Sequence, residues 1–174
     1  MKSTSEGYLI FIVEDAPIYG QILEYYLSLN PDYKVKWFLN GQDCLNNLYQ
    51  KPDLISLDFG LPDYPGDKLF QKIKDSVPEV PVIIISSQED IGLAVKLLKM
   101  GVSDYLVKDE STRDLLWNSI NRIRENQNLK QELEQLKEEL GQKFSFEKSI
   151  NGQCEPIMKV FSLMEKAIKT NINV

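Results

Sequence analysis

Five short apolar runs recur along the chain, and segments with helical periodicity separate them. Three of these runs consist almost entirely of Leu, Ile, Val and Phe, which is typical of strands buried on both faces. Strands that alternate with helices predict a parallel sheet covered by helices on both sides. We therefore expect an α/β protein with a doubly wound, five-stranded parallel sheet. The predicted strands are Tyr8–Val13, Tyr33–Trp37, Asp53–Leu57, Val82–Ile85 and Asp104–Val107.

The segments between the strands carry apolar residues at helical spacing, three or four residues apart. Each such stripe predicts one amphipathic helix. The four stripes are Ile18, Ile22, Tyr25, Tyr26 and Leu29; Cys44, Leu45 and Leu48; Leu69, Phe70 and Ile73; and Ile91, Val95, Leu97 and Leu98.

Composition excludes several classes of protein. The chain has no histidine, so Ser-His-Asp catalysis, Cys-His catalysis and histidine metal sites are excluded. Its two cysteines, Cys44 and Cys154, lie far apart in the sequence, which indicates a reducing compartment and no structural zinc. The net charge of −6 argues against a nucleic-acid-binding face. The N-terminal apolar run Tyr8–Val13 is shorter than the apolar region of a secretory signal (about 7–15 residues) or a membrane span (about 20), so we expect a cytoplasmic protein.

A long helix is predicted after the fifth strand. Residues 110–140 contain neither Gly nor Pro and are rich in helix-forming residues. The first part of this helix carries Leu116, Ile120 and Ile123, a face that can pack on the sheet. The second part carries leucines with the 4-3-4 spacing of a coiled-coil seam. These leucines are Leu129, Leu133, Leu136 and Leu140.

The charges beside these leucines favour a parallel homodimer. With Leu133 at heptad position a, Asn126 occupies the preceding a position, where a buried Asn favours two strands in register. Acidic residues then fall at g positions and lysines at the following e positions, so they would attract one another across the dimer. The pairs are Glu125 with Lys130 and Glu132 with Lys137. The alternative is a solvated helix that leans on its own domain.

Three acidic residues follow predicted strands. Glu14 and Asp15 come after the first strand, and Asp58 comes after the third. In an open parallel sheet, ligands bind beyond the carboxyl ends of the strands, at the point where the strand order reverses. A single acid in such a place is commonly a helix cap, but clustered carboxylates repel one another unless a cation compensates them. Three together predict a site for a hard cation such as Mg²⁺.

Two further polar residues close the last two strands. Ser86 ends the fourth strand and Lys108 ends the fifth. A hydroxyl and an ammonium beside a carboxylate–metal cluster can bind a phosphoryl group, because they supply hydrogen bonds and positive charge to its oxygens. Taken singly, Ser86 could be a strand-end cap and Lys108 a surface lysine.

Residues 8–125 resemble the receiver domain of two-component response regulators. The resemblance rests on four segments that fill the family's sites in order: FIVEDAP, LISLDFGLPDYPGDKLF, PVIIISS and GVSDYLVK. It implies a flavodoxin-like sheet with strand order 2-1-3-4-5 and Asp58 as the acceptor of a phosphoryl group from a histidine kinase. It also implies that Asp15, Asp58 and the backbone carbonyl of Gly60 bind Mg²⁺ directly, with Glu14 acting largely through water. Tyr105 falls on the family's aromatic switch position.

The sequence departs from the family pattern at two positions. The acidic pair is Glu14–Asp15 where two aspartates are commoner, and Asp109 follows Lys108 where the family usually has proline.

Residues 144–174 resemble the opening of the AAA+ domain of sigma-54-dependent activators. Phe146, Ile150, Gly152, Ile157 and Val160 sit at matching positions, but no G-x-x-x-x-G-K-[ST] loop occurs in the chain. We therefore expect a receiver domain at 1–124, a coiled-coil linker at 125–143 and a truncated AAA+ start at 144–174. Contact with sigma-54 polymerase would need domains beyond this chain.

Two other functions are compatible with parts of the pattern. One is a passive dimerisation module with a vestigial acidic site. The other is a Mg²⁺-dependent phosphatase of the haloacid dehalogenase type, which needs a second acid two residues after its aspartate nucleophile. Gly60 occupies that position, so we expect a signalling switch and not an enzyme.

Overall fold

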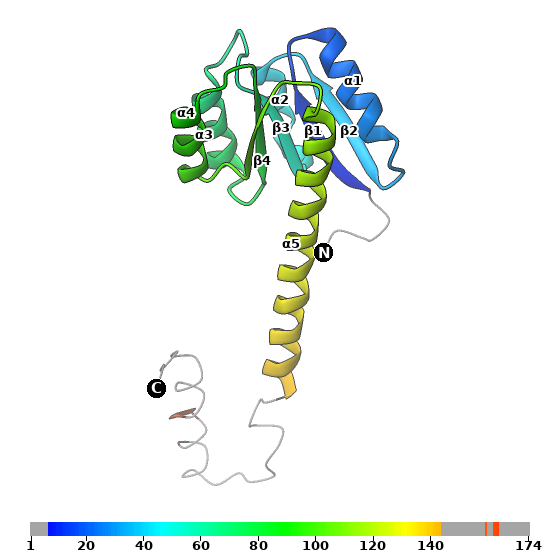
Figure 1. The fold of residues 1–174 in the computed structure, drawn as a ribbon. Coiled ribbons are helices and arrows are strands. Elements are labelled where there is room, and N and C mark those ends of the chain that lie inside the picture. Colours follow the sequence, from blue (N-terminus) through cyan, green and yellow to red (C-terminus); the bar gives the residue numbers. More distant parts are fainter. Residues whose placement is uncertain (1–6, 144–158, 160–161, 164–174) are drawn as a thin grey trace. The chain divides into compact units, whose positions relative to one another are not determined.

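The computed structural model describes residues 7–143, 159 and 162–163. Its centre is a five-stranded parallel sheet in the order β2-β1-β3-β4-β5 (Figure 1). This confirms the predicted fold class and strand order. The strands are β1 (Tyr8–Val13), β2 (Tyr33–Phe38), β3 (Leu54–Asp58), β4 (Val82–Ser86) and β5 (Asp104–Val107).

Helices cover both faces of this sheet. The residues buried on one face come from α1 (Pro17–Ser28) and α5 (Thr112–Lys143). The other face is covered by α2, α3 and α4, with the short 3-10 turn η1 next to α2 (Figure 1). These elements are α2 (Gly41–Asn47), η1 (Leu48–Gln50), α3 (Gly66–Ser76) and α4 (Ile91–Lys99).

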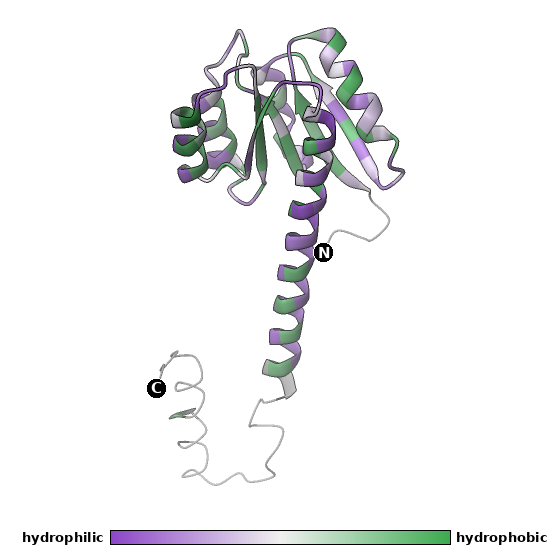
Figure 2. Cartoon of the chain, viewed as in Figure 1, coloured by the Kyte–Doolittle hydropathy of each residue, from purple (hydrophilic) through white to green (hydrophobic). Residues whose placement is uncertain are grey.

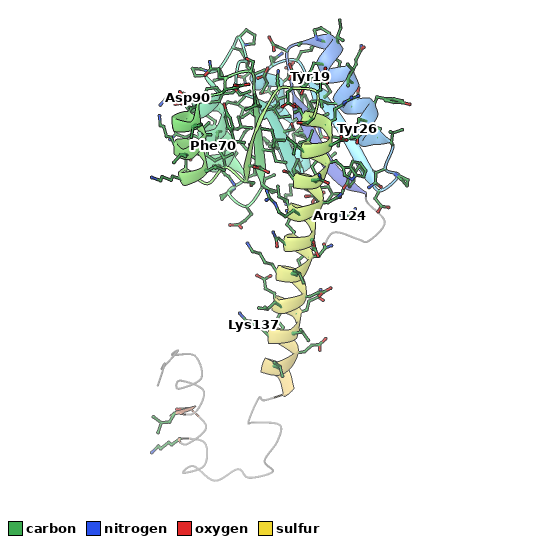
Figure 3. The ribbon with its side chains drawn as sticks, in the orientation of Figure 1. Tyr19, Tyr26, Phe70, Asp90, Arg124 and Lys137 are labelled. Carbon is green, nitrogen blue, oxygen red and sulfur yellow. The ribbon has the colours of Figure 1, made fainter. Side chains whose placement is uncertain are left out.

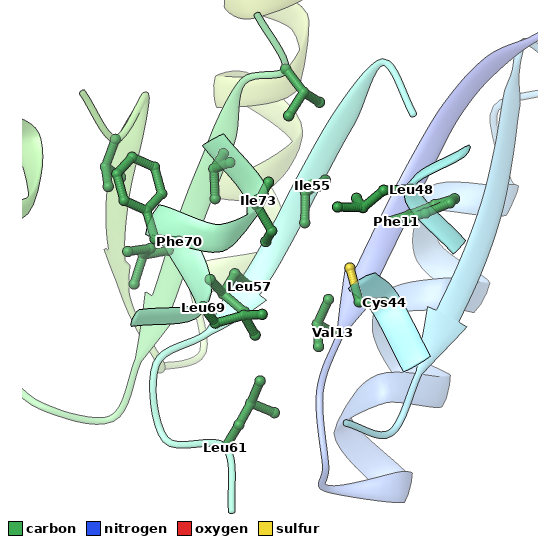
Figure 4. Packing of buried hydrophobic residues seen from close by; sticks show 14 of the residues in the cluster. Phe11, Val13, Cys44, Leu48, Ile55, Leu57, Leu61, Leu69, Phe70 and Ile73 are labelled. Carbon is green, nitrogen blue, oxygen red and sulfur yellow. The ribbon is translucent and has the colours of Figure 1, made fainter. Parts of the chain in front are cut away.

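The core consists of two apolar clusters, one on each face of the sheet. Figure 4 shows the cluster under α2 and α3, where Phe11 and Val13 of β1 and Ile55 and Leu57 of β3 meet Leu69 of α3. On the other face, alternate residues of the same strands pack against α1 and α5. Every residue of β3 and β4 is buried, as expected for central strands, and β4 is coloured hydrophobic along most of its length in Figure 2.

The stripes expected on α1 and α4 lie mainly on solvent-facing sides. Helix α1 packs on the sheet through Gly20, Leu23 and Leu27, whereas Ile18 and Tyr25 are exposed. Helix α4 buries Leu97 but exposes Ile91, Val95 and Leu98. Periodicity therefore located these helices, but apolar residues occur on two faces of each, and only the packing identifies the buried face.

Helix α5 runs from Thr112 to Lys143, slightly beyond the predicted residues 110–140. Leu116 and Ile120 are fully buried, as predicted, and Ile123 is partly buried against the same cluster. The Trp117 ring lies 5.9 Å from the ring of Tyr26 and 5.7 Å from that of Tyr33, measured between centroids. These contacts tie the first turns of α5 to α1 and β2.

The chain divides by packing into residues Met1–Glu125 and Asn126–Val174. In the second unit, the described part of α5 carries the four leucines of the predicted seam. Leu129, Leu133, Leu136 and Leu140 are each more than half exposed in the single chain. Dimerisation through them stays a prediction. The predicted AAA+ start at 144–174 lies almost wholly outside the described residues.

Candidate functional site

Glu14 and Asp15 stand where β1 ends. The main chain here is held by β2, because the Glu14 N–H donates to the carbonyl of Phe38 at 3.0 Å. The indole N–H of Trp37 donates to the carbonyl of Glu14 at 2.8 Å. Glu14 turns its side chain inward and is buried, whereas Asp15 is exposed. The two neighbouring acids therefore meet different environments.

Asp58 is the last residue of β3 and faces the same edge of the sheet. It pairs in register with Ile85 of β4, and its side chain is largely buried. The Gly60 N–H donates to Asp58 Oδ1 at 3.0 Å, which fixes the rotation of the carboxylate. Carboxylate oxygens of Glu14, Asp15 and Asp58 lie within 4.8 Å of one another. Three oxygen donors this close suit a hard divalent cation, so the residues fit the Mg²⁺ that the sequence predicts.

Lys108 reaches this cluster from the residue after β5. Its Nζ lies 2.8 Å from Asp58 Oδ2, and 2.9 and 2.8 Å from Oε1 and Oε2 of Glu14. Burial lowers the pKa of the ammonium, but the hydrogen bonds with Asp58 and Glu14 outweigh burial and hold that pKa above its ordinary value. Lys108 is therefore charged at neutral pH and bridges carboxylates from two strands.

Glu14 titrates differently from an ordinary surface glutamate. Burial raises the pKa of its carboxyl, and the Asp58 charge adds to the rise. The hydrogen bond from Lys108 opposes this shift. The charged state of Glu14 thus depends on Lys108, or on another cation in the same place.

Ser86 and Tyr105 flank the site on β4 and β5. Ser86 is the last residue of β4, is buried, and pairs in register with Val107 next to Lys108. Its Oγ accepts a 3.1 Å hydrogen bond from the N–H of Gln88. The Tyr105 hydroxyl donates to the carbonyl of the same Gln88 at 2.7 Å. Gln88 therefore links the predicted hydroxyl and the predicted switch residue.

Asp109 forms several hydrogen bonds in the turn just before α5. Its carboxylate accepts hydrogen bonds from the Ser111 N–H at 2.8 Å and hydroxyl at 2.7 Å. Its own N–H donates to the Thr112 hydroxyl oxygen at 2.6 Å, and that hydroxyl donates to the Val107 carbonyl at 2.8 Å. The described peptide bonds are all trans. Asp109 thus stabilises the turn that leads into α5, at the position where the family usually has proline.

The structure places Glu14, Asp15, Asp58, Ser86 and Lys108 at one edge of the sheet, as the sequence predicts for strand-end residues. Sequence reasoning missed two residues beside them, Trp37 and Tyr19. Trp37 holds the Glu14 carbonyl, and the Tyr19 ring centroid lies 4.8 Å from Lys108 Nζ. Both aromatic residues resemble ordinary core positions in the sequence, because their role depends on contacts between distant segments.

The fold and the site together define an α/β protein with an acidic, lysine-bridged site at the carboxyl edge of a parallel sheet. The model of the family described as the response regulator receiver domain matches residues 10–121, and the chain belongs to this family. YbdJ of Bacillus subtilis, named as an uncharacterized transcriptional regulatory protein, is 36% identical over 118 residues, which cover 68% of this chain and 52% of YbdJ.

Further similarities agree with this family. The luminescence regulatory protein LuxO of Vibrio campbellii is 32% identical over 123 residues, which cover 70% of this chain and 27% of LuxO. A crystal structure of the signal receiver domain of a Luxo repressor protein from Vibrio parahaemolyticus superposes with a TM-score of 0.67 at 27% identity, covering 74% of this chain and 98% of that domain. The chain spans about half or less of the length of these curated relatives. No helix among the described residues is long and apolar enough to cross a membrane.

Proposed function

We propose that this chain is a phosphorylation-dependent signalling switch in which Asp58 accepts a phosphoryl group from a histidine kinase. The observation that carries the proposal is the position of Asp58 at the end of β3, between the strand that leads to Glu14 and the strand that ends at Ser86, with Lys108 Nζ 2.8 Å from its carboxylate and the other two carboxylates of the cluster beside it. Glu14 also belongs to the cluster, but both of its carboxylate oxygens are hydrogen-bonded to Lys108.

Mg²⁺ is the cofactor that this cluster would bind. Asp15, Asp58 and the backbone carbonyl of Gly60 would be its direct ligands, with Glu14 acting largely through water. When bound, the ion would offset the negative charge that gathers as a phosphoryl group approaches carboxylates. The support is the set of oxygen donors within 4.8 Å of one another.

The transfer step uses the carboxylate of Asp58 as nucleophile. One of its oxygens forms a bond to phosphorus while the bond from phosphorus to the donor nitrogen of the kinase breaks, and the electron pair of that bond returns to nitrogen. Lys108 would follow the developing charge from the carboxylate to a phosphoryl oxygen, and Ser86 would hydrogen-bond another. The product is an acyl phosphate on Asp58.

Tyr105 and Ser86 would carry the signal away from the site. Both are hydrogen-bonded to Gln88, in the loop between β4 and α4. If the Ser86 hydroxyl turned toward the phosphoryl group, its hydrogen bond with Gln88 would change and the loop would shift. The hydrogen bond between Tyr105 and Gln88 would then change as well. The surface of α4, β5 and α5 would then differ between the two states.

The wider assembly is also proposed. We expect a cytoplasmic homodimer formed by the receiver (1–124) and the coiled-coil linker (125–143), followed by the start of a sigma-54-type AAA+ domain (144–174). Phosphorylation would control assembly of that ATPase, and sigma-54 polymerase would be reached only through domains outside this chain. No nucleic acid or membrane contact is proposed for this chain itself.

Acyl-phosphate labelling tests the central proposal. The native chain, incubated with acetyl phosphate and Mg²⁺, should gain the mass of one phosphoryl group, and Asp58→Asn should not. Asp75→Asn, which changes an exposed aspartate on α3, is the matched control and should label normally. Equal labelling of Asp58→Asn would overturn the assignment. A native chain that accepts neither acetyl phosphate nor beryllofluoride would leave the passive dimerisation module as the better interpretation.

A further inference from the structure

Tyr19 stands beside Lys108, the lysine that also contacts two carboxylates of the site. Lys108 Nζ lies 4.8 Å from the centroid of the Tyr19 ring, within the range of a cation–π contact. The same Nζ makes its hydrogen bonds to oxygens of Glu14 and Asp58. The ammonium thus contacts an aromatic ring as well as two carboxylates.

The main chain fixes the position of this ring. Tyr19 lies in the first turn of α1, where Pro17 sets the start of the helix and the Gly20 N–H donates to the Ala16 carbonyl at 2.9 Å. The ring packs against the apolar cluster shared by α1 and α5, at the end of α1 near the start of α5 (Figure 3). Because the core holds this ring in place, the ring limits the positions that the flexible lysine side chain beside it can take.

The Tyr19 hydroxyl contributes less than the ring. It is buried beside Thr112, but it makes no well-aligned hydrogen bond within the part of the chain that the structure describes. A buried hydroxyl without a partner adds nothing to stability, so a ring without it should serve equally well.

We propose that Tyr19 is a positioning residue for Lys108, whose ring confines the ammonium to the side of the site where Asp58 is phosphorylated. The inference rests on the proposed role of Asp58 as phosphoacceptor and adds a determinant of its rate. Without the ring, the lysine stem can sample conformations away from the carboxylates, so fewer molecules hold the charge where the transferring group needs it.

Two substitutions separate the ring from the hydroxyl. Tyr19→Phe keeps the ring and should phosphorylate with acetyl phosphate at the native rate. Tyr19→Leu removes the ring and should slow phosphorylation about twofold to fivefold, the size of one partly exposed cation–π contact. The ε-methylene protons of Lys108 should show an aromatic ring-current shift by NMR in the native and Phe chains and lose it in the Leu chain. Thermal unfolding of each variant checks that the fold is intact.

A double-mutant cycle shows whether Tyr19 acts through Lys108. In a Lys108→Met chain, Tyr19→Leu should cause no further slowing, because the group that it positions is gone. The same slowing in both backgrounds would overturn the proposal, as would a native rate in Tyr19→Leu or a Phe variant as slow as the Leu variant. Failure of the underlying phosphoacceptor assignment is distinguishable, since it would appear as an unlabelled native chain or a labelled Asp58→Asn chain.

Discussion

The Nζ of Lys108 lies 2.8 Å from Oδ2 of Asp58, so the end of β3 is joined to the residue after β5 across the intervening strand β4. The same ammonium contacts Glu14, the residue that follows the carboxyl end of β1. Three carboxylates close together need positive charge nearby. Lys108 supplies it in the metal-free chain, and this arrangement leads to the first two predictions.

Lys108→Met should lower the free energy of unfolding of the metal-free chain by about 1–3 kcal/mol at neutral pH, because Glu14 and Asp58 would face each other without their cation. Urea unfolding measures the loss. Lys96→Met, on the exposed side of α4, is the matched control and should change stability by less than about 0.5 kcal/mol. Mg²⁺ should restore part of the loss, since we propose that it binds the same carboxylates. A variant as stable as the control would contradict this account.

The loss caused by Lys108→Met should depend on pH. Burial raises the pKa of Glu14 above its ordinary value of 4.5, and Lys108 opposes the rise. A carboxyl with a higher pKa in the folded state stabilises the fold fully below its unfolded pKa, and this stabilisation is lost as pH rises through the folded pKa. Without Lys108, the folded pKa of Glu14 rises further. The loss should therefore be largest near pH 7 and shrink below about pH 5, and urea midpoints at both pH values would measure this.

The two neighbouring acids should differ in Mg²⁺ binding. Asp15 is exposed at the open edge of the cluster, whereas Glu14 is buried and occupied by Lys108. Asp15→Asn should therefore weaken Mg²⁺ binding more than Glu14→Gln does, as measured by calorimetric titration. Asp75→Asn, an exposed acid on α3, serves as the control. The reverse order would mean that the roles of the pair are exchanged.

The close approach of α1 to β2 gives a fourth prediction. A Cβ atom at Gly20 would overlap the indole ring of Trp37, the residue that holds the Glu14 carbonyl. Gly20→Ala should lower stability by about 1–3 kcal/mol, although alanine is the better helix former. Gly92→Ala is the control, because its Cβ would meet just the flexible Asp90 carboxylate. Thermal unfolding measures the stability of both variants. Equal stabilities would show that Trp37 can move away from the new Cβ atom without loss of stability.

Much of the fold could be predicted because strand and helix periods are local properties of the sequence. The runs that became β3 and β4 are mainly Leu, Ile and Val, and burial on both faces favours that composition. The buried face of α1 could not be predicted, because Ile18 and Ile22 made an apolar stripe as regular as that of Leu23 and Leu27. Which stripe is buried is decided by the sheet beneath it.

Some residues of the site could likewise be predicted from the sequence, and others could not. Glu14, Asp58 and Lys108 were predictable because each stands at the end of a strand, and parallel strands bring such ends to one edge. The Trp37 bond to Glu14 and the Tyr19 ring beside Lys108 were not, since no local pattern marks them. They depend on how closely α1 and β2 approach β1, which Gly20 permits.

The linker helix gives the last prediction. Leu129, Leu133, Leu136 and Leu140 should form a parallel two-stranded seam, with Glu125–Lys130 and Glu132–Lys137 pairs across it. All four leucines are more than half exposed in the single chain, so a partner helix would remove apolar area from water at about 25 cal/mol per Å². Two heptads bury little area, and contacts between the receivers are expected to supply the rest. Asn126 at position a would favour two strands in register at some cost in stability.

Replacing Leu133 and Leu136 with Asp should give monomers in sedimentation, because it places charge at the a and d positions of the seam. Gln131→Asp with Gln135→Asp adds the same two charges on the outer face of the helix and should leave the dimer intact. Both double variants should still be phosphorylated on Asp58, since the site lies in the receiver. A Leu133→Asp, Leu136→Asp chain that remains dimeric would mean that the receivers alone hold the dimer. Loss of phosphorylation in that chain would mean that the linker and the site are not separable.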